Sequence, residues 1–322
     1  MNQLSSCLVT GASGGLGSAL VERLRQDGVR VRALVRRLPE ASPDGIEIVR
    51  GDLADADAVD RAVQGTTTVF HVGATMKGTW PEHQAGTIDG TRHVLAACRR
   101  HQVAKLVHVS SMSVIQWAGA EPFAPVDETT PLEPRAEERG AYTRAKLEAE
   151  KLVSAAAAEG LPVVIVRPGK IFGPRNPLMS GSVARRVAGR YLVLGDGELP
   201  LPLVHVDDVV DALMLAARGD LHRGEIIQII DPDVWTQNQV LAEMVGPGAQ
   251  VLRVPRAVVF ALGRASELAL GALKKPSPAS RYRLQSALAL RRFESKNADL
   301  LLGWKPRLGV RQGILRLKAQ GT

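Results

Sequence analysis

The feature that most constrains the fold is a glycine-rich turn close to the start of the chain. The sequence TGASGGLG at 10–17 follows the apolar run CLVTG at 7–11 and opens a segment of helical period. The apolar run predicts a buried strand, and Gly15–Asp27 predicts a helix that ends at Gly28. Glycines at such a turn allow a tight bend and a close approach of the backbone to a pyrophosphate, which the helix N-terminus attracts. The turn therefore predicts a nucleotide-binding fold.

Strand and helix patterns go on alternating after this turn. We expect further strands over 29–35, 46–49, 68–72, 105–110, 163–167 and 225–230, and helices over 83–101, 141–158 and 206–217. The strands are continuous apolar runs, as in a parallel sheet that helices cover on both faces. We therefore expect an α/β fold, a Rossmann-type doubly wound parallel sheet with a smaller, mainly helical C-terminal lobe. The dinucleotide-binding domain is expected to span 1–168 plus about 204–230, and the substrate-binding lobe 169–203 and 231–322.

The balance of charged residues bears on which partners the chain can bind. The chain has a net charge of +8, from 41 Lys and Arg against 33 Asp and Glu. The basic residues are scattered along the sequence, and only 4% of residues are aromatic, so few side chains are available for stacking on bases. We therefore expect no nucleic-acid partner, and we interpret the charge as a solvated surface that also favours phosphate-bearing small ligands.

The cysteines and the apolar runs bear on the cellular compartment of the protein. Cys7 and Cys98 lie in apolar runs and have the spacing of neither metal ligands nor a disulfide framework. The first six residues are polar, and Arg264 and Glu267 interrupt the longest apolar stretch, at 257–273. We expect a cytoplasmic protein with no signal peptide, no membrane span and no metal site.

A tyrosine, a lysine and a serine carry the chemistry. Tyr142 and Lys146 are four residues apart in a predicted helix, so they share one face. An ammonium group near the phenol lowers the tyrosine pKa from about 10, so the pair can exchange a proton with a substrate oxygen. Ser111 follows a strand at the carboxyl edge, where open α/β sheets bind ligands, and can hydrogen-bond the same oxygen. The three residues predict proton transfer at a carbonyl or carbinol carbon.

With the TGxxGxxG spacing, these residues resemble the extended branch of the short-chain dehydrogenase/reductase family, and the resemblance covers nearly the whole chain. Further motifs that carry it are GDL at 51–53, VFHV at 69–72, TIDGT at 87–91, VSS at 109–111, YTRAK at 142–146, RPG at 167–169, FGP at 172–174 and HVDD at 205–208. The resemblance implies catalytic roles for Ser111, Tyr142 and Lys146. It also implies that a nicotinamide dinucleotide is bound by Gly11, Ser13, Gly14, Gly15, Leu16, Gly17, Arg36, Arg37, Asp52, Leu53, Val72, Gly73, Ala74, Tyr142, Lys146, Pro168, Gly169 and Ile171.

The end of the second predicted strand bears on which dinucleotide is bound. In NAD(H)-binding folds an acidic residue about 20 positions past the turn binds the ribose 2′-hydroxyl. Here the strand ends in Leu34-Val35-Arg36-Arg37, with no acidic residue before Glu40. Guanidinium groups bind a 2′-phosphate through charge-assisted hydrogen bonds. We therefore expect NADP(H) rather than NAD(H), with Arg36 on the phosphate, Arg37 beside it and a hydroxyl from Ser13.

Within the extended branch, the reductase side of the family fits best. The runs at 69–72 and 87–90 and the closing LLGWKP at 301–306 resemble dihydroflavonol reductases and 3β-hydroxysteroid dehydrogenases. That resemblance implies a ketone or secondary alcohol substrate that is bulky and apolar. We expect an aliphatic pocket to which the following residues contribute: Met76, Trp80, Leu178, Met179, Leu201, Leu203 and Leu262.

Two alternatives stay open. A nucleotide-sugar epimerase or dehydratase needs cations for a sugar diphosphate, and Arg167, Arg175, Arg185 and Arg186 are candidates. Sugar dehydratases commonly have an acidic residue directly after the catalytic serine, however, where Met112 stands here. A non-catalytic NADP(H)-binding regulator would lack the tyrosine and lysine, both of which are present.

The resemblance also implies a homodimer. In the family, helices corresponding to 83–101 and 141–158 pack against their two-fold mates. Leu95, Leu147 and Leu152 are apolar residues that can serve either the core or this interface. Asp207 and Asp208 begin the helix over 206–217, where we expect them to cap its N-terminus.

Overall fold

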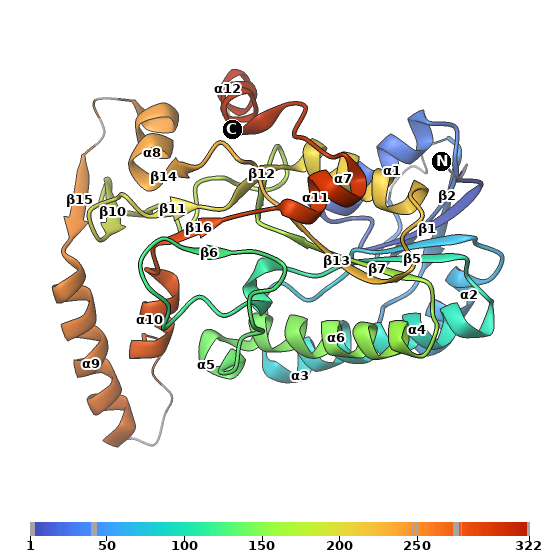
Figure 1. Cartoon of the computed structure of the whole chain (residues 1–322), viewed down its shortest axis with the longest axis horizontal. Coiled ribbons are helices and arrows are strands. Elements are labelled where there is room, and N and C mark those ends of the chain that lie inside the picture. Colours follow the sequence, from blue (N-terminus) through green and yellow to red (C-terminus); the bar gives the residue numbers. More distant parts are fainter. Residues whose placement is uncertain are drawn as a thin grey trace.

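The computed structural model describes residues 4–39, 44–246, 248, 250–272, 277 and 279–320. A seven-stranded parallel sheet with the order β13-β7-β5-β4-β1-β2-β3 forms its centre (Figure 1). Its strands are β1 (Ser6–Thr10), β2 (Arg30–Val35), β3 (Ile46–Arg50), β4 (Thr68–His71), β5 (Lys105–Val109), β7 (Val163–Pro168) and β13 (Arg223–Ile229). The direction of winding reverses between β1 and β4, which leaves a crevice at the carboxyl ends of these strands. The predicted α/β fold is confirmed.

Helices cover both faces of this sheet (Figure 1). One face carries α1 (Gly15–Gln26), α7 (Val206–Arg218) and α11 (Lys296–Leu302), and the other carries α2 (Ala56–Val63), α4 (Gly90–Arg100) and α6 (Ala141–Ala158). Along β7, Val164 and Val166 pack into the core of the first layer, while Val163 and Ile165 pack into that of the second. Burial on both faces explains why the strands are continuous apolar runs.

The expected helix over 83–101 is confirmed, but it begins earlier and its first part is π-helical. A short helix, α3 (Trp80–His83), begins earlier because Thr79 and Glu82 form a capping box. A π-helical segment, η1 (Gln84–Asp89), then leads into α4. In this segment a Cβ on Gly86 would lie 2.4 Å from the Thr75 hydroxyl oxygen. The loop after β4 therefore packs directly on the helix backbone, a contact that hydrophobic periodicity does not reveal.

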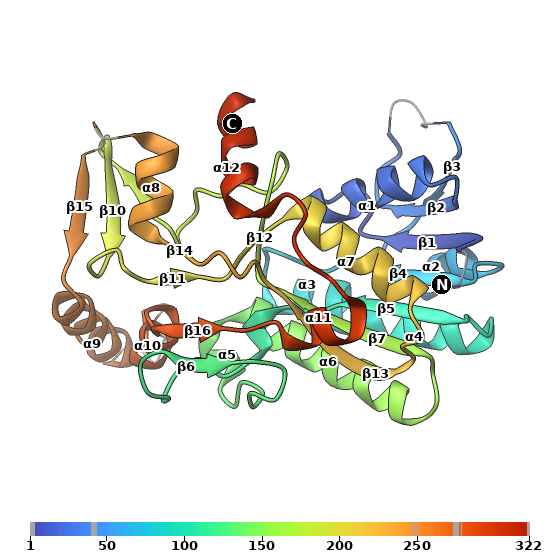
Figure 2. The same ribbon diagram turned by 45° about the horizontal axis from the view of Figure 1, so that its top comes forward.

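The other elements lie mostly to one side of the sheet (Figure 2). They are β6 (Ala124–Val126), β8 (Lys170–Phe172), β9 (Arg185–Val187), β10 (Arg190–Leu194), β11 (Pro200–Leu201), β12 (Leu203–His205), β14 (Trp235–Thr236), β15 (Val251–Val254), β16 (Arg291–Phe293), η2 (Met112–Val114), α5 (Ala136–Arg139), α8 (Gln237–Val245), α9 (Arg256–Ala272), α10 (Arg281–Ala287) and α12 (Gly309–Ala319). The parallel pair β6–β16 joins the two predicted domains, whose boundaries stay a prediction.

Asp208 fastens the C-terminal segment to the sheet domain. Its buried carboxylate accepts backbone N–H groups from Arg307 at 2.8 Å, Leu308 at 3.0 Å and Gly309 at 3.0 Å. The expectation that the two aspartates cap α7 is wrong, because the cap is His205, whose Nδ1 accepts the N–H of Asp207 at 3.2 Å. Asp208 is turned inward toward the tail instead.

We predict that Asp208→Ala lowers the free energy of unfolding by about 3 kcal/mol or more, because each buried N–H left without an acceptor costs about 1–3 kcal/mol. Urea denaturation measures the change. Asp207→Ala, at the exposed neighbouring position, is the matched control and is expected to cost less than about 0.5 kcal/mol. Equal, small changes in the two variants would contradict the fastening role of Asp208.

Candidate active site

A cavity of about 730 Å³ lies at the carboxyl edge of the sheet, at the reversal between β1 and β4. It is lined by all of the predicted cofactor and catalytic residues except Arg37, which is exposed beside it. The sequence analysis did not include these further lining residues: Leu34, Gly51, Thr75, Lys77, Gly86, Val109, Ser110, Lys170 and Asn176. The volume is within the range of sites for small ligands and cofactors.

The glycine turn forms a cradle in which side chains do not fit. A Cβ on Gly11 would lie 2.6 Å from the Cα of Gly73, and one on Gly17 would lie 2.2 Å from the carbonyl oxygen of Gly11. Helix α1 begins at Gly15 with no side-chain cap and no acidic residue in its first turn. Its positive end and backbone N–H groups therefore face the cavity without a competing carboxylate. This arrangement fits the pyrophosphate of a dinucleotide.

The ends of the next two strands provide charges of opposite sign. Arg36, after β2, and Asp52, after β3, both line the cavity. Glu40, the first acidic residue after the two arginines, lies outside the described residues. Arg36 is therefore the cation placed where a 2′-phosphate would need one.

Lys146 joins helix α6 to the central sheet. Its side chain is buried, and Nζ donates to the carbonyl oxygen of Val109 at 2.6 Å. Burial lowers the pKa of Lys146 to about 8, and the negative charge of Glu150, one helical turn further on, opposes this shift. Ser111 lies two residues after Val109, where its hydroxyl accepts the N–H of Ser113 at 3.1 Å. The serine and the helix are thus positioned by the same strand end.

The surroundings of Tyr142 favour its neutral, protonated form. Burial raises its pKa, and a side-chain hydrogen bond with Ser111 only partly offsets that rise. The expectation that Lys146 lowers the tyrosine pKa is not met here, because the effect of burial is larger and the ammonium is directed to Val109. A protonated phenol at this position is a proton donor.

The arginines considered for a sugar diphosphate are dispersed. Arg167 is buried and binds both carboxylate oxygens of Glu150, at 3.0 and 2.6 Å. Arg175 donates to the carbonyl oxygen of Ser13 at 3.0 Å. Arg185 is an exposed residue of β9 that does not line the cavity. These residues do not converge on one ligand site.

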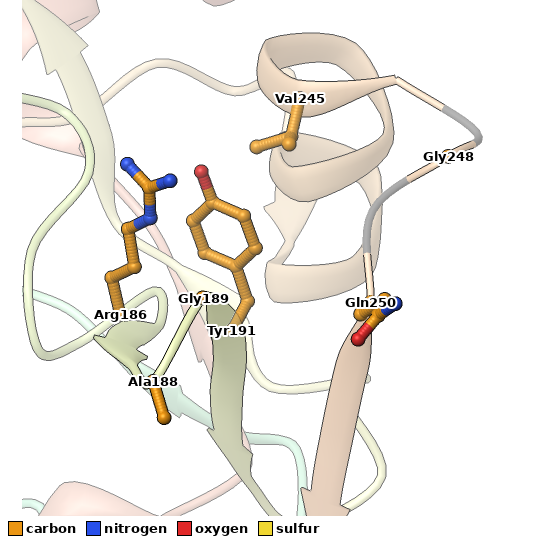
Figure 3. A pocket seen from close by; sticks show the side chains of 7 residues that line it. All are labelled: Arg186, Ala188, Gly189, Tyr191, Val245, Gly248 and Gln250. Atoms are coloured by element: carbon orange, nitrogen blue, oxygen red, sulfur yellow. The ribbon is translucent and has the colours of Figure 1, made fainter.

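Arg186 belongs to a second cavity, of about 510 Å³. Figure 3 shows its side chain and that of Tyr191 extending side by side from the β9–β10 hairpin toward the end of α8. The lining residues are Arg186, Ala188, Gly189, Tyr191, Val245, Gly248 and Gln250. None of them lines the cavity at the sheet edge, so the fourth candidate arginine lies elsewhere too.

Most of the aliphatic residues expected in a substrate pocket are in other places. Met76 does line the cavity. Trp80 does not, and its ring packs against the guanidinium of Arg144, whose Cζ lies 4.0 Å from the ring centre. Leu262 is 63% exposed on α9. The remaining residues belong to or pack against the separate core of the C-terminal lobe: Leu178, Met179, Leu201 and Leu203. Aliphatic composition alone did not distinguish a pocket wall from a core.

Within the described ranges, no group of three or more His, Cys, Asp or Glu side chains is arranged to hold a metal ion. No helix in the same ranges combines the length and hydropathy needed to cross a membrane.

Comparison with known proteins identifies the family. The NAD dependent epimerase/dehydratase family matches residues 7–229. The chain is 33% identical to the 2-alkyl-3-oxoalkanoate reductase of Stenotrophomonas maltophilia, over 98% of this chain and 99% of the relative. It is 30% identical to the decarboxylating sterol-4-alpha-carboxylate 3-dehydrogenase ERG26 of Candida albicans, over 97% and 96%. A solved structure, MoeE5 in complex with UDP-glucuronic acid and NAD, aligns with a TM-score of 0.75 at 25% identity, over 99% of this chain and 100% of that one.

The chain therefore belongs to the NAD dependent epimerase/dehydratase family, the extended short-chain dehydrogenases/reductases. Within that family it is an NAD(P)-dependent oxidoreductase.

A buried cluster that was not expected from the sequence joins the segments that carry Ser111 and Tyr142. Arg139, three residues before Tyr142, donates to the carbonyl oxygens of Ser113 at 3.0 Å and Ile115 at 2.9 Å. Its charge is balanced by Glu133 at 3.1 Å, whose side chain is fully buried and also accepts the hydroxyl of Tyr282 on α10. The cluster thus ties the segment after Ser111 to the start of α6.

We predict that Glu133→Gln lowers both stability and turnover, because it leaves the Arg139 guanidinium buried without a counter-charge. Breaking a buried ion pair costs about 3–5 kcal/mol. Urea unfolding and steady-state turnover measure the two effects. Glu138→Gln removes a partly exposed ion pair with Arg135 and should cost less than about 1 kcal/mol. If both variants behave like the wild type, the cluster does not position the site.

Proposed function

We propose that this protein is an NADP(H)-dependent reductase that interconverts a ketone and a secondary alcohol on a bulky, apolar small molecule. The observation that carries this proposal is the pairing of Ser111 with a protonated Tyr142 in the cavity that also contains the glycine cradle. Reduction of a ketone needs a proton donor beside the carbonyl oxygen, and a phenol with a raised pKa holds its proton at neutral pH.

The proposed mechanism assigns one task to each residue. The bound cofactor supplies the hydride that reaches the carbonyl carbon. Ser111 donates a hydrogen bond that orients the carbonyl oxygen, and the Tyr142 hydroxyl transfers its proton to that oxygen. Lys146, one helical turn away, holds the helix that carries Tyr142 through its hydrogen bond to Val109, and water reprotonates the phenolate that remains.

The nucleotide-sugar alternative has one observation in its favour, the similarity to MoeE5 in complex with UDP-glucuronic acid and NAD. Against it, Arg167 is occupied by Glu150, and Met112, directly after Ser111, is a buried apolar residue. A purely regulatory role would not require Ser111, Tyr142 and Lys146, all of which are present. We therefore favour the reductase.

The relatives suggest which ketones to try first. Both names, 2-alkyl-3-oxoalkanoate reductase and sterol-4-alpha-carboxylate 3-dehydrogenase, describe substrates with a carboxylate on the carbon next to the reacting one. We propose 3-oxo acids and the matching 3-hydroxy acids as the first substrates for this chain.

We also propose a homodimer in the reducing cytoplasm, formed through α4 and α6. Leu95 and Leu147 are buried within the protomer, whereas Leu152 is half-buried on α6. Of the three leucines considered for the interface, Leu152 therefore has the most surface to offer a second copy.

We predict that Tyr142→Phe keeps cofactor affinity but reduces turnover by about 100-fold or more, the scale of general acid catalysis. The substitution removes one hydroxyl and leaves the glycine cradle untouched. Turnover is followed by the absorbance of reduced nicotinamide, and cofactor affinity by protein fluorescence. Tyr191→Phe, in the second cavity, is the matched control and should keep wild-type turnover. Full activity in Tyr142→Phe would rule out the mechanism.

We predict that Arg36→Ala weakens NADPH binding by about 2–3 kcal/mol and leaves NADH binding unchanged, because only NADPH carries the 2′-phosphate. Titration calorimetry with both cofactors measures the effect. Arg30→Ala, at the exposed opposite end of β2, controls for the loss of a surface arginine. Tighter binding of NADH than of NADPH by the wild type would overturn the NADP(H) assignment.

A further inference from the structure

Lys170 is a cation in the wall of the candidate active site with no assigned role. It begins strand β8, directly after Pro168 and Gly169, and it lines the cavity that contains Ser111 and Tyr142. Its side chain is half-buried rather than extended into solvent. Burial lowers the pKa of Lys170 to about 8, so the ammonium form is less stable here than in water, although it still predominates at neutral pH.

The ammonium group of Lys170 has only neutral partners. It donates to the carbonyl oxygen of Leu178 at 2.6 Å and to the hydroxyls of Ser180 at 2.7 Å and Ser182 at 3.0 Å. No carboxylate in the described ranges lies within 4.0 Å of it. A half-buried charge with no counter-charge gains most from an anion that binds beside it.

Ser180 and Ser182 complete a small receptor for such an anion. Each hydroxyl accepts a hydrogen bond from Lys170 and keeps its own O–H for donation, and their oxygens lie 3.1 Å apart. One O–H is used in that contact, which leaves the other for a ligand. The bond to Ser182 is the longest of the three from Lys170 and lies at the exposed edge of the cluster, so it is the one that an incoming anion can replace.

We propose that Lys170, Ser180 and Ser182 form a subsite that binds a carboxylate of the substrate. This inference rests on the proposed function and deepens it, because it makes the substrate an oxo acid or hydroxy acid rather than an uncharged ketone. Lys170 lines the same cavity as Tyr142, and Ser180 and Ser182 are hydrogen-bonded to it just outside the cavity lining, so one ligand can place its carbonyl at the tyrosine and its acid group at the lysine.

A carboxylate fits this cluster better than a diphosphate does. The receptor consists of one ammonium group and two hydroxyls, which matches the single negative charge of a carboxylate. A sugar diphosphate carries two or more negative charges and calls for several cations. The nearby arginine at 167 is already paired with Glu150.

The reaction balances without any further reactant. In the oxidative direction the carbinol C–H bond breaks and its hydride passes to NADP⁺. The hydroxyl proton passes through Tyr142 to water, and the products are the 3-oxo acid, NADPH and a proton. The carboxylate at Lys170 is unchanged throughout, so the subsite contributes binding and orientation only.

The test compares an acid with its ester. The probes are 2-butyl-3-hydroxyoctanoate and its methyl ester, which differ in the one charge that the subsite recognises. For the wild type and for Lys170→Met we measure KM with NADP⁺, and separately the Kd of each probe on the cofactor-free protein by titration calorimetry. Lys170→Met is expected to raise KM and Kd for the acid by about 10- to 100-fold, the effect of losing a hydrogen bond to a charged group, and to leave the ester unchanged.

Two further variants test whether the effect is specific to this subsite. Lys105→Met removes another lysine whose Nζ bonds a backbone carbonyl, that of Gly219 at 2.7 Å, but at the opposite end of the sheet, and it should change neither probe. Ser182→Ala preserves the charge and should raise the Kd of the acid alone, by less than Lys170→Met does. This variant tests the subsite even if Lys170→Met does not fold.

The outcomes separate the subsite from the proposed function. If Lys170→Met changes KM and Kd equally for the acid and the ester, or leaves both values for the acid unchanged, the carboxylate subsite is wrong. The proposed reductase activity is not affected by that result. Lysine-dependent binding of the acid without turnover of either probe supports the subsite and counts against the reductase. If UDP-glucose, which has a diphosphate but no carboxylate, binds the wild type more tightly than the acid does, and Lys170→Met abolishes that binding, the anion is a diphosphate and the carboxylate assignment is wrong.

Discussion

The hydrogen bond from Lys146 to the carbonyl oxygen of Val109 is the interaction on which the site depends. It fixes helix α6 to the end of β5, so it sets Tyr142, one turn earlier in the helix, against Ser111, just past the strand. A buried ammonium group is costly unless it is paired and hydrogen-bonded. Glu150 provides the nearby negative charge, and Arg167 of β7 in turn holds Glu150, so three elements of the sandwich support one proton-transfer site.

The two lysines of the cavity are supported in different ways, and the difference is informative. Lys146 has a fixed backbone acceptor, and the negative charge of Glu150 acts on it although the two groups form no ion pair. Lys170 has hydroxyls and a carbonyl but no carboxylate within ion-pair distance in the described ranges, as suits a group that meets its counter-ion in a ligand. Burial lowers the pKa of both lysines to about 8, so the partners and not the pKa distinguish their roles.

The features that sequence predicts well here are those with a local physical cause. Continuous apolar runs predicted the parallel sheet, and the glycine spacing predicted a turn whose close contact with Gly73 leaves no room for a Cβ. Helix α2 was missed although Asp55, which accepts the N–H of Ala58, is a capping signal, because the helix is short. The contacts of Glu133 with Arg139 and of Lys170 with Ser182 join segments whose approach the fold decides, so periodicity and motif spacing do not reveal them.

The central claim is that this chain directs a hydride to a carbonyl carbon while Tyr142 protonates the oxygen. The most direct measurement uses NADPH with deuterium at both C4 positions of the nicotinamide ring, together with a 2-alkyl-3-oxoalkanoate, and locates the deuterium in the product by NMR. The account predicts a 3-hydroxy acid that carries deuterium on its carbinol carbon in the wild type, with the yield greatly reduced in Tyr142→Phe. A product without deuterium at that carbon, or equal yields from the two proteins, would contradict it.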